Sequence, residues 1–183
     1  EVLITPMKKY QHYFPMWSND GKLAAKFIII SNGTDGNLDG VRHGNERVLR
    51  ARLNDAEFFY REDQKTPLAE KVDRLRNIVF HVKLGSLLDK AARLKELTGF
   101  IADEISRDLS QGALATGTTQ HAVRAAWLCK ADLSTLMVIE FPSLQGIVGK
   151  YYAENSGEPC EVATAIEEHY QPIAADGPLP RVR

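Results

Sequence analysis

The chain has little cysteine, no long apolar run and no excess of charge of one sign. Its two cysteines, Cys129 and Cys160, lie far apart and form neither a CxxC pair nor a disulfide framework, so a reducing cytoplasm is the simplest compartment. Apolar runs such as residues 27–30 have the length of a strand, and none approaches a membrane span. A net charge of −1 gives no overall attraction to nucleic acid. We therefore expect a cytoplasmic protein without a membrane partner.

The sequence also lacks the short motifs of a self-contained active site. It contains no GxxxxGK[ST] phosphate loop, no GxGxxG after a strand and no GxSxG elbow. Neither cysteine has a histidine partner at a recognisable spacing. The histidines stand singly, without HExxH, HxH or CxxC spacing: they are His12, His43, His81, His121 and His169. We therefore expect no catalytic residue, no metal site and no cofactor in this stretch of sequence.

What is present fits a soluble protein. A chain of 183 residues with 44% apolar and 26% charged residues can bury one medium core or two small ones. The first residues have strand character, and a Gly-Pro-Leu-Pro tail follows Pro172. We expect an internal fragment of a longer protein.

Local patterns predict an α+β fold class. Strand-like residues 13–17 and 23–31 flank Asn19, Asp20 and Gly21, which predicts a β-hairpin. The β-branched run at 27–30 predicts a buried strand, and Pro15 predicts an edge or a bulge. Residues 31–40 are a loop by composition. Helical periodicity then predicts helices over 41–63, 66–79 (with Thr66 as N-cap and Pro67 at the first helical position), 86–108, 120–140, 143–154 and 159–170, with a loop at 112–119.

The most informative stretch is residues 44–59, which predicts an amphipathic helix rich in arginine. Arg47 and Arg50 fall opposite its apolar stripe, Arg52 lies on the flank, and Arg42 precedes them. Guanidinium groups suit bidentate binding of phosphate or carboxylate, which makes these arginines candidate RNA contacts. The alternative is a salt-bridged surface helix, with Glu46 paired to Arg50 and Asp55 paired to Arg52.

Two further places hold candidate residues. Lys8 and Lys9 alternate with aromatic residues over 8–14, so they could bind phosphates if exposed; the alternative is that Tyr13 and Phe14 form the hairpin core beside solvated lysines. Asp132 lies late in a predicted apolar helix, where an unpaired carboxylate is costly. We expect a salt bridge or a helix N-terminus to hold it.

The segment GNERVLRARLNDAEFF, with ITPMKKYQHYFPM before it and FHVKLGSLLDKAARL, KADLSTLMVIEFPSLQGIVGKYYA and AIEEHYQP after it, resembles the beta subunit of bacterial glycyl-tRNA synthetase. The likeness runs in order over nearly the whole chain. It implies a short β-hairpin piece of an α+β module over 1–40, connecting helices with the arginine-rich segment over 41–80, and a mainly α-helical, degenerate HD-like domain, truncated here, over 81–183. Ala131 stands where HD phosphohydrolases have a histidine, so a metal-dependent phosphohydrolase remnant is the weaker alternative.

The resemblance also implies a function. In that family a heterotetramer of two alpha and two beta subunits ligates glycine to tRNA(Gly), with ATP and Mg²⁺ used by the alpha subunit and the tRNA held by the beta subunit. RNA-binding residues are then expected among Lys8, Lys9, Arg42, Arg47, Arg50 and Arg52, and structural ones at Asp55, Phe58, Phe59 and Asp132. A non-catalytic scaffold, in which the arginines pair with neighbouring carboxylates, is the competing interpretation.

Overall fold

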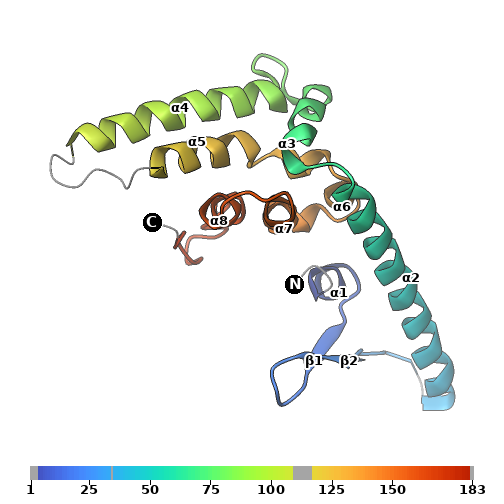
Figure 1. Ribbon diagram of the computed structural model, residues 1–183. Coiled ribbons are helices and arrows are strands. Elements are labelled where there is room, and N and C mark those ends of the chain that lie inside the picture. Colours follow the sequence, from blue (N-terminus) through green and yellow to red (C-terminus); the bar gives the residue numbers. More distant parts are fainter. Residues whose placement is uncertain (1–3, 34, 109–116, 182–183) are drawn as a thin grey trace. The chain divides into compact units, whose positions relative to one another are not determined.

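The structure, a computed structural model, describes residues 4–33, 35–108 and 117–181. The chain divides into two compact units, unit 1 (Glu1–Glu62) and unit 2 (Asp63–Arg183) (Figure 1). This division falls near the end of a long helix, whereas the sequence-based segments meet at 40/41 and 80/81. Those three segments stay a prediction about domain organisation, and the two units are described one at a time.

Unit 1 contains a β-hairpin and a long helix. Its elements are α1 (Ile4–Tyr10), β1 (Phe14–Trp17), β2 (Leu23–Ile28), the 3-10 helix η1 (Asp35–Asn37) and α2 (Leu38–Gln64), which continues into unit 2. The predicted hairpin is confirmed: Gly21 takes the positive φ of 77° that its turn requires, and the ladder is irregular between Pro15 and Trp17. The predicted α+β class is therefore confirmed.

The expectation of a buried strand at 27–30 is wrong. Ile28 is 52% exposed and Ile30 is 79% exposed. The sheet has two strands, and side chains alternate between its faces. One face packs Phe27 against Tyr13, whose ring centroids are 5.0 Å apart, while Ile28 lies on the other face. The β-branched run predicted the strand. It did not predict that no described element would pack against the Ile28 face of the sheet.

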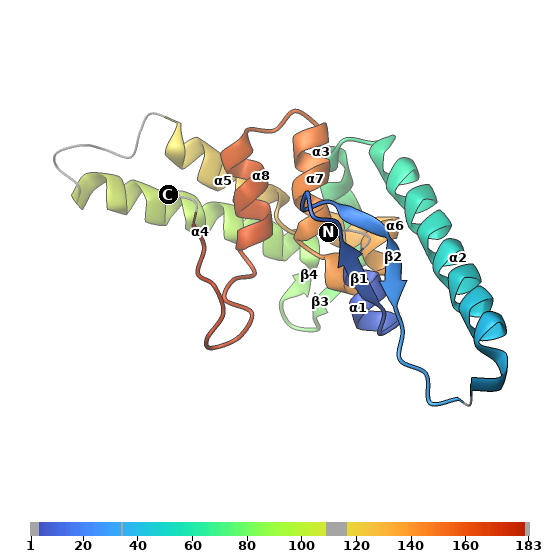
Figure 2. The same ribbon diagram turned by 90° about the horizontal axis from the view of Figure 1, so that it is seen from below.

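Unit 2 is mainly helical. Its elements beyond α2 are α3 (Leu68–Lys71), η2 (Val72–Asn77), β3 (Val79–His81), β4 (Gly85–Ser86), α4 (Leu87–Asp108), α5 (Thr118–Leu128), η3 (Ala131–Ser134), α6 (Leu136–Glu140), η4 (Pro142–Leu144), α7 (Ile147–Asn155) and α8 (Cys160–Glu168). Figures 1 and 2 show α4 beside α5 and α7 beside α8, in agreement with their packing contacts. The core between them is apolar, with Leu128, Leu144, Val148 and Ile166 fully buried.

Some of the predicted helices are confirmed by the structure, and others are wrong in part. Those at 41–63, 86–108 and 159–170 are confirmed as α2, α4 and α8, and the one at 143–154 begins later, as α7. Most of the predicted loop at 112–119 lies outside the described residues. The helix at 66–79 is wrong after Lys71, where the chain becomes a 3-10 helix and then β3. Pro67, not Thr66, is its N-cap residue, and the first amide, Leu68 N–H, donates to Ser156 Oγ at 3.1 Å.

The single helix predicted at 120–140 is also wrong, because the chain breaks into α5, η3 and α6. Thr135 starts α6 as an N-cap residue, and its Oγ1 accepts the Val138 N–H at 3.3 Å. The two amides that precede Val138 in α6 find their acceptor in a distant residue of the chain. Asp63 Oδ1 accepts Leu136 N–H at 3.0 Å, and its Oδ2 accepts Met137 N–H at 2.9 Å. A distant carboxylate thus supports the start of this short helix.

Asp63 links four segments of unit 2. Besides the two α6 amides, its Oδ2 accepts the Tyr152 hydroxyl of α7 at 3.0 Å. The ammonium of Lys71, on α3, lies 3.8 Å from Oδ1. Both charged side chains are buried, at 3% and 1% exposure. Burial lowers the pKa of Lys71, and the nearby Asp63 carboxylate opposes that change. The carboxylate therefore satisfies a helix terminus, a hydroxyl and a buried cation.

We expect Asp63→Ala to lower the free energy of unfolding by about 3–5 kcal/mol, because it leaves the Lys71 charge and two helix amides without their acceptor. Lys71→Met should cost less than half of that, since the carboxylate keeps its three hydrogen bonds. Urea unfolding followed by circular dichroism measures both. Equal losses in the two variants would show that the ion pair, and not the hydrogen-bonded carboxylate, is the main contribution.

Candidate functional site

The outer face of α2 carries the arginine-rich stretch. With 3.6 residues per turn, Arg47, Arg50 and Asn54 fall on one side of the helix, opposite buried Ala56. Arg52 lies on the flank, and all three arginines are exposed. The predicted amphipathic arrangement of this helix is therefore seen in the structure. A rigid helix holds these guanidinium groups without a loop to order.

Several acidic side chains of α2 pair with cations other than Arg47, Arg50 and Arg52. Arg42 lies 3.2 Å from Asp39 and 3.9 Å from Glu46, and Arg61 pairs with Glu57. The predicted pairs Glu46–Arg50 and Asp55–Arg52 are wrong, since Glu46 faces Arg42 one turn earlier. In the part of the chain that the structure describes, Arg47, Arg50 and Arg52 form no ion pair. The salt-bridged alternative therefore holds for Arg42 and fails for these three.

The structure brings some of the candidate cations together and leaves others apart. A hollow of about 1100 Å³ in unit 1 lies between the hairpin and α2, and Arg42, Arg50 and Asn54 line it together with apolar side chains such as Phe27 and Leu53. Arg47 and Arg52 do not line it. Lys8 and Lys9 are exposed in the last turn of α1.

The aromatic residues near these lysines divide into core and surface. Tyr13 is buried, and its hydroxyl donates to Asn45 Oδ1 of α2 at 2.7 Å, whereas Phe14 is half exposed. Of the residues expected to be structural in α2, Phe59 is half-buried and Asp55 is exposed. Phe58 is 57% exposed, and its ring meets that of Phe59 edge-on at a centroid distance of 5.7 Å.

Asp132 lies in unit 2 on η3, wholly buried. Its Oδ2 accepts the backbone N–H of Gly146 at 2.6 Å, directly before α7. Of the two supports considered from the sequence, the structure thus has the helix N-terminus. Gly146 has a φ of 80°, and a Cβ there would lie 2.7 Å from the Tyr170 ring, so glycine is required. Oδ1 has no hydrogen-bond partner among the described residues, and burial raises the pKa of Asp132 to about 6.

The surroundings of Asp132 are cationic and aromatic. Lys130 Nζ donates to His169 Nε2 at 2.7 Å and lies 3.9 Å from the centre of the Tyr170 ring. Burial, reinforced by Lys130, lowers the pKa of His169 to about 4, so the imidazole is neutral and can accept. Ala131, buried next to Asp132, offers no ligand atom. No group of three His, Cys, Asp or Glu side chains that could hold a metal ion occurs among residues 4–33, 35–108 and 117–181.

Asp63 is the polar residue that the sequence analysis missed. The available signal was its position, four residues after Phe59 and seven after Ala56, which places a carboxylate on the apolar stripe of α2. A charge at such a position predicts a buried partner. The partners themselves, on α3, α6 and α7, follow only from the tertiary structure.

The two shifted pKa values of this region give opposite dependences of stability on pH. The folded chain binds the Asp132 proton more tightly than an unfolded chain, whose aspartate has a pKa of about 4, so this group adds stability as pH falls from 6 towards 4. His169, with an unfolded pKa of about 6.5, removes stability as pH falls from 6.5 towards 4. Burial raises the pKa of the neighbouring Cys129 to about 11 and also raises the pKa of Tyr170, so both groups stay protonated in this window.

We therefore expect Asp132→Asn to make unfolding stability fall more steeply on acidification, because only the His169 effect remains. His169→Gln should make stability rise on acidification, with a limit of about 3 kcal/mol from Asp132. Urea midpoints at pH 4.5, 5.5 and 6.5 measure both slopes. Parallel pH profiles for the two variants and the parent would contradict the assignment.

Comparison with known proteins places these sites in a family. The family described as glycyl-tRNA synthetase beta subunit matches residues 1–183. The chain is 49% identical over 180 residues to the glycine–tRNA ligase beta subunit of Syntrophomonas wolfei, 47% identical over 180 residues to that of Moorella thermoacetica and 46% identical over 181 residues to that of Listeria monocytogenes.

These alignments cover 98–99% of this chain but 25% of each relative, so the chain spans about a quarter of the relatives' length. Within the described residues, no helix has the length and apolar character needed to cross a membrane. The family resemblance inferred from GNERVLRARLNDAEFF and the segments around it is confirmed: the chain belongs to the glycyl-tRNA synthetase beta subunit family.

Proposed function

We propose that this part of the beta subunit supports ATP-dependent ligation of glycine to tRNA(Gly) by binding the tRNA and by contributing to subunit assembly. The observation that carries the proposal is a set of exposed arginines on α2 that form no ion pair with any described residue: Arg47, Arg50 and Arg52. The reaction and the RNA are inferred from the relatives, which are named glycine–tRNA ligase beta subunit. The protein would work in the cytoplasm, as part of a heterotetramer of two alpha and two beta subunits.

Arginine chemistry supports RNA as the ligand. A guanidinium group donates two parallel hydrogen bonds to a phosphate and keeps its charge at any physiological pH. On a duplex or a folded RNA, such contacts position the molecule without reading its sequence. They also release condensed counterions, so binding should weaken as salt rises, by a slope of about 0.7–0.9 per phosphate contact. Arg42 would add a weaker contact, since it is already paired with Asp39 and Glu46. Lys8 and Lys9 would also add weaker contacts, because an ammonium group lacks the bidentate fork of a guanidinium group.

The chemistry itself would take place outside this chain. The sequence has no phosphate loop and no activated nucleophile, and ATP with Mg²⁺ would be bound by the alpha subunit. Subunit assembly is supported by exposed apolar side chains on the unit 1 hairpin, where Phe14 and Trp17 are about half exposed. No observation favours a phosphohydrolase, because Ala131 supplies no ligand and Asp132 accepts a backbone amide at the start of α7.

We expect the triple variant Arg47→Glu, Arg50→Glu and Arg52→Glu to weaken tRNA(Gly) binding by the assembled enzyme at least about tenfold near 0.1 M salt. The slope of log Kd against log salt should fall by about 2–3 as these phosphate contacts are lost. Filter binding at several salt concentrations measures both, and aminoacylation at saturating tRNA should change much less.

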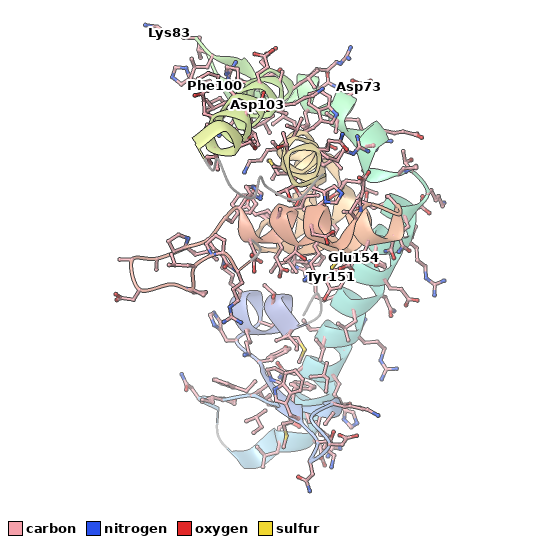
Figure 3. The ribbon with its side chains drawn as sticks, turned by 60° about the vertical axis from the view of Figure 1, so that its left-hand side comes forward. Asp73, Lys83, Phe100, Asp103, Tyr151 and Glu154 are labelled. Carbon is pink, nitrogen blue, oxygen red and sulfur yellow. The ribbon has the colours of Figure 1, made fainter. Side chains whose placement is uncertain are left out.

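A matched control reverses three exposed cations of unit 2: Arg74→Glu, Arg76→Glu and Lys83→Glu. Lys83 extends from the turn between β3 and β4 (Figure 3). This control has the same net charge as the test variant. If both variants lose affinity equally, the effect is one of overall charge; if neither loses affinity, the arginines of α2 do not bind tRNA.

A further inference from the structure

Phe58 is an exposed aromatic ring on the arginine face of α2. It lies four residues after Asn54 and eight after Arg50, so helix geometry places the three in one row, with a rise of about 6 Å between neighbours. All three side chains are exposed. A cation, an amide and an aromatic ring therefore follow one another along the same side of a rigid helix.

The packing of Phe58 leaves a ring face available. Its contact with Phe59 is edge-on, at 5.7 Å and 65° between ring planes, and more than half of its surface is exposed. A single exposed phenylalanine is common on protein surfaces, so the residues around it decide whether it suits a ligand. The edge-on contact with Phe59 limits the orientations of the Phe58 ring, which lowers the entropy cost of placing a flat ligand on it.

The charges around Phe58 indicate which side a ligand uses. Seen along the helix axis, Arg47, Arg50 and Asn54 lie on one side of Phe58, as does the Glu57–Arg61 ion pair. Asp55 and Glu62 lie on the other side. An anionic backbone would approach from the arginine side and keep away from the carboxylates. The ring itself, uncharged, would meet a flat apolar group attached to that backbone.

Phe100 provides an internal comparison. It is 63% exposed on α4, where Asp103 lies one turn away and Glu104 follows (Figure 3). Both helices therefore expose a phenylalanine, but carboxylates lie before and after Phe100 along its row, at Glu96 and Glu104. The residues that precede Phe58 in its row, Asn54 and Arg50, carry no negative charge. Charge complementarity to an RNA backbone separates the two rings.

We propose that Phe58 stacks on an unpaired base of the RNA whose phosphates bind Arg47 and Arg50, with Asn54 within reach of the base edge. Stacking of this kind accepts any base, because every base has a π face, and it is unavailable in an uninterrupted duplex, where both faces are covered. The ligand class is therefore single-stranded or looped RNA. This inference rests on the proposed binding of RNA by α2.

The test uses the full-length beta subunit with two fluorescent RNA probes of the same sequence, one single-stranded and one as a blunt duplex. Phe58→Ala should weaken binding of the single strand about tenfold and leave duplex binding within about twofold. Phe58→Trp should retain the preference for the single strand. Phe100→Ala is the matched control and should change neither affinity, and unfolding midpoints check that each variant is folded.

The outcomes separate this inference from the proposed function. If the triple arginine variant loses affinity for both probes while Phe58→Ala behaves like the parent protein, the stacking inference is overturned and phosphate binding stands. If neither variant changes RNA binding, both fail. If Phe58→Ala weakens association with the alpha subunit and leaves both RNA affinities unchanged, Phe58 belongs to a protein interface, which also overturns the inference.

Discussion

Unit 2 depends on one constraint: the backbone N–H groups at the start of a buried helix need a hydrogen-bond acceptor from outside that helix. Several of its elements are shorter than ten residues, so a large share of their backbone amides lies in first turns, where no intrahelical acceptor exists. Asp63 accepts the first amides of α6, and Asp132 accepts the amide directly before α7. Both carboxylates are buried, and each comes from another element. The starts of α6 and α7 therefore lie inside the unit with a carboxylate acceptor for these amides.

The two carboxylates are stabilised to different degrees. Asp63 has two amides, a hydroxyl and a lysine ammonium around it, so its burial is well compensated. Asp132 has one short hydrogen bond and one oxygen without a partner in the described chain, which agrees with its raised pKa. Its position beside Ala131 gives a physical reading of the degenerate HD-like pattern: the aspartate serves the start of α7 through Gly146. The HD-like assignment of the whole domain stays a prediction.

What could be predicted from the sequence was set by local patterns, and what could not was set by distant partners. The periodicity of residues 41–63 and 86–108 suffices for α2 and α4, and Asn19-Asp20-Gly21 suffices for the hairpin turn. The break of the helix at 120–140 depends on Asp63, more than 70 residues earlier, and the start of α3 depends on Ser156. For the candidate site, helix geometry correctly predicted that Arg47 and Arg50 are exposed. Glu46 lies one turn from Arg42 and one turn from Arg50, and only the side-chain coordinates show that it pairs with Arg42.

The same allocation of carboxylates explains why the arginines of α2 are available. Asp39 and Glu46 neutralise Arg42, Glu57 neutralises Arg61, and Asp63 turns inward to Lys71 and the α6 amides. Asp55 is exposed, and among the residues placed in the structure no arginine forms an ion pair with it. The helix is thus nearly balanced in formal charge, yet Arg47, Arg50 and Arg52 in its middle turns form no ion pair with any residue that the structure describes. The net charge of −1 does not reveal this local group of positive charges. Electrostatic attraction to a phosphate depends on the charges within about a Debye length, about 8–10 Å at physiological salt, and not on their sum over the chain. A nearly neutral protein can for this reason present a locally positive surface, at Arg47 and Arg50, along one side of a single helix.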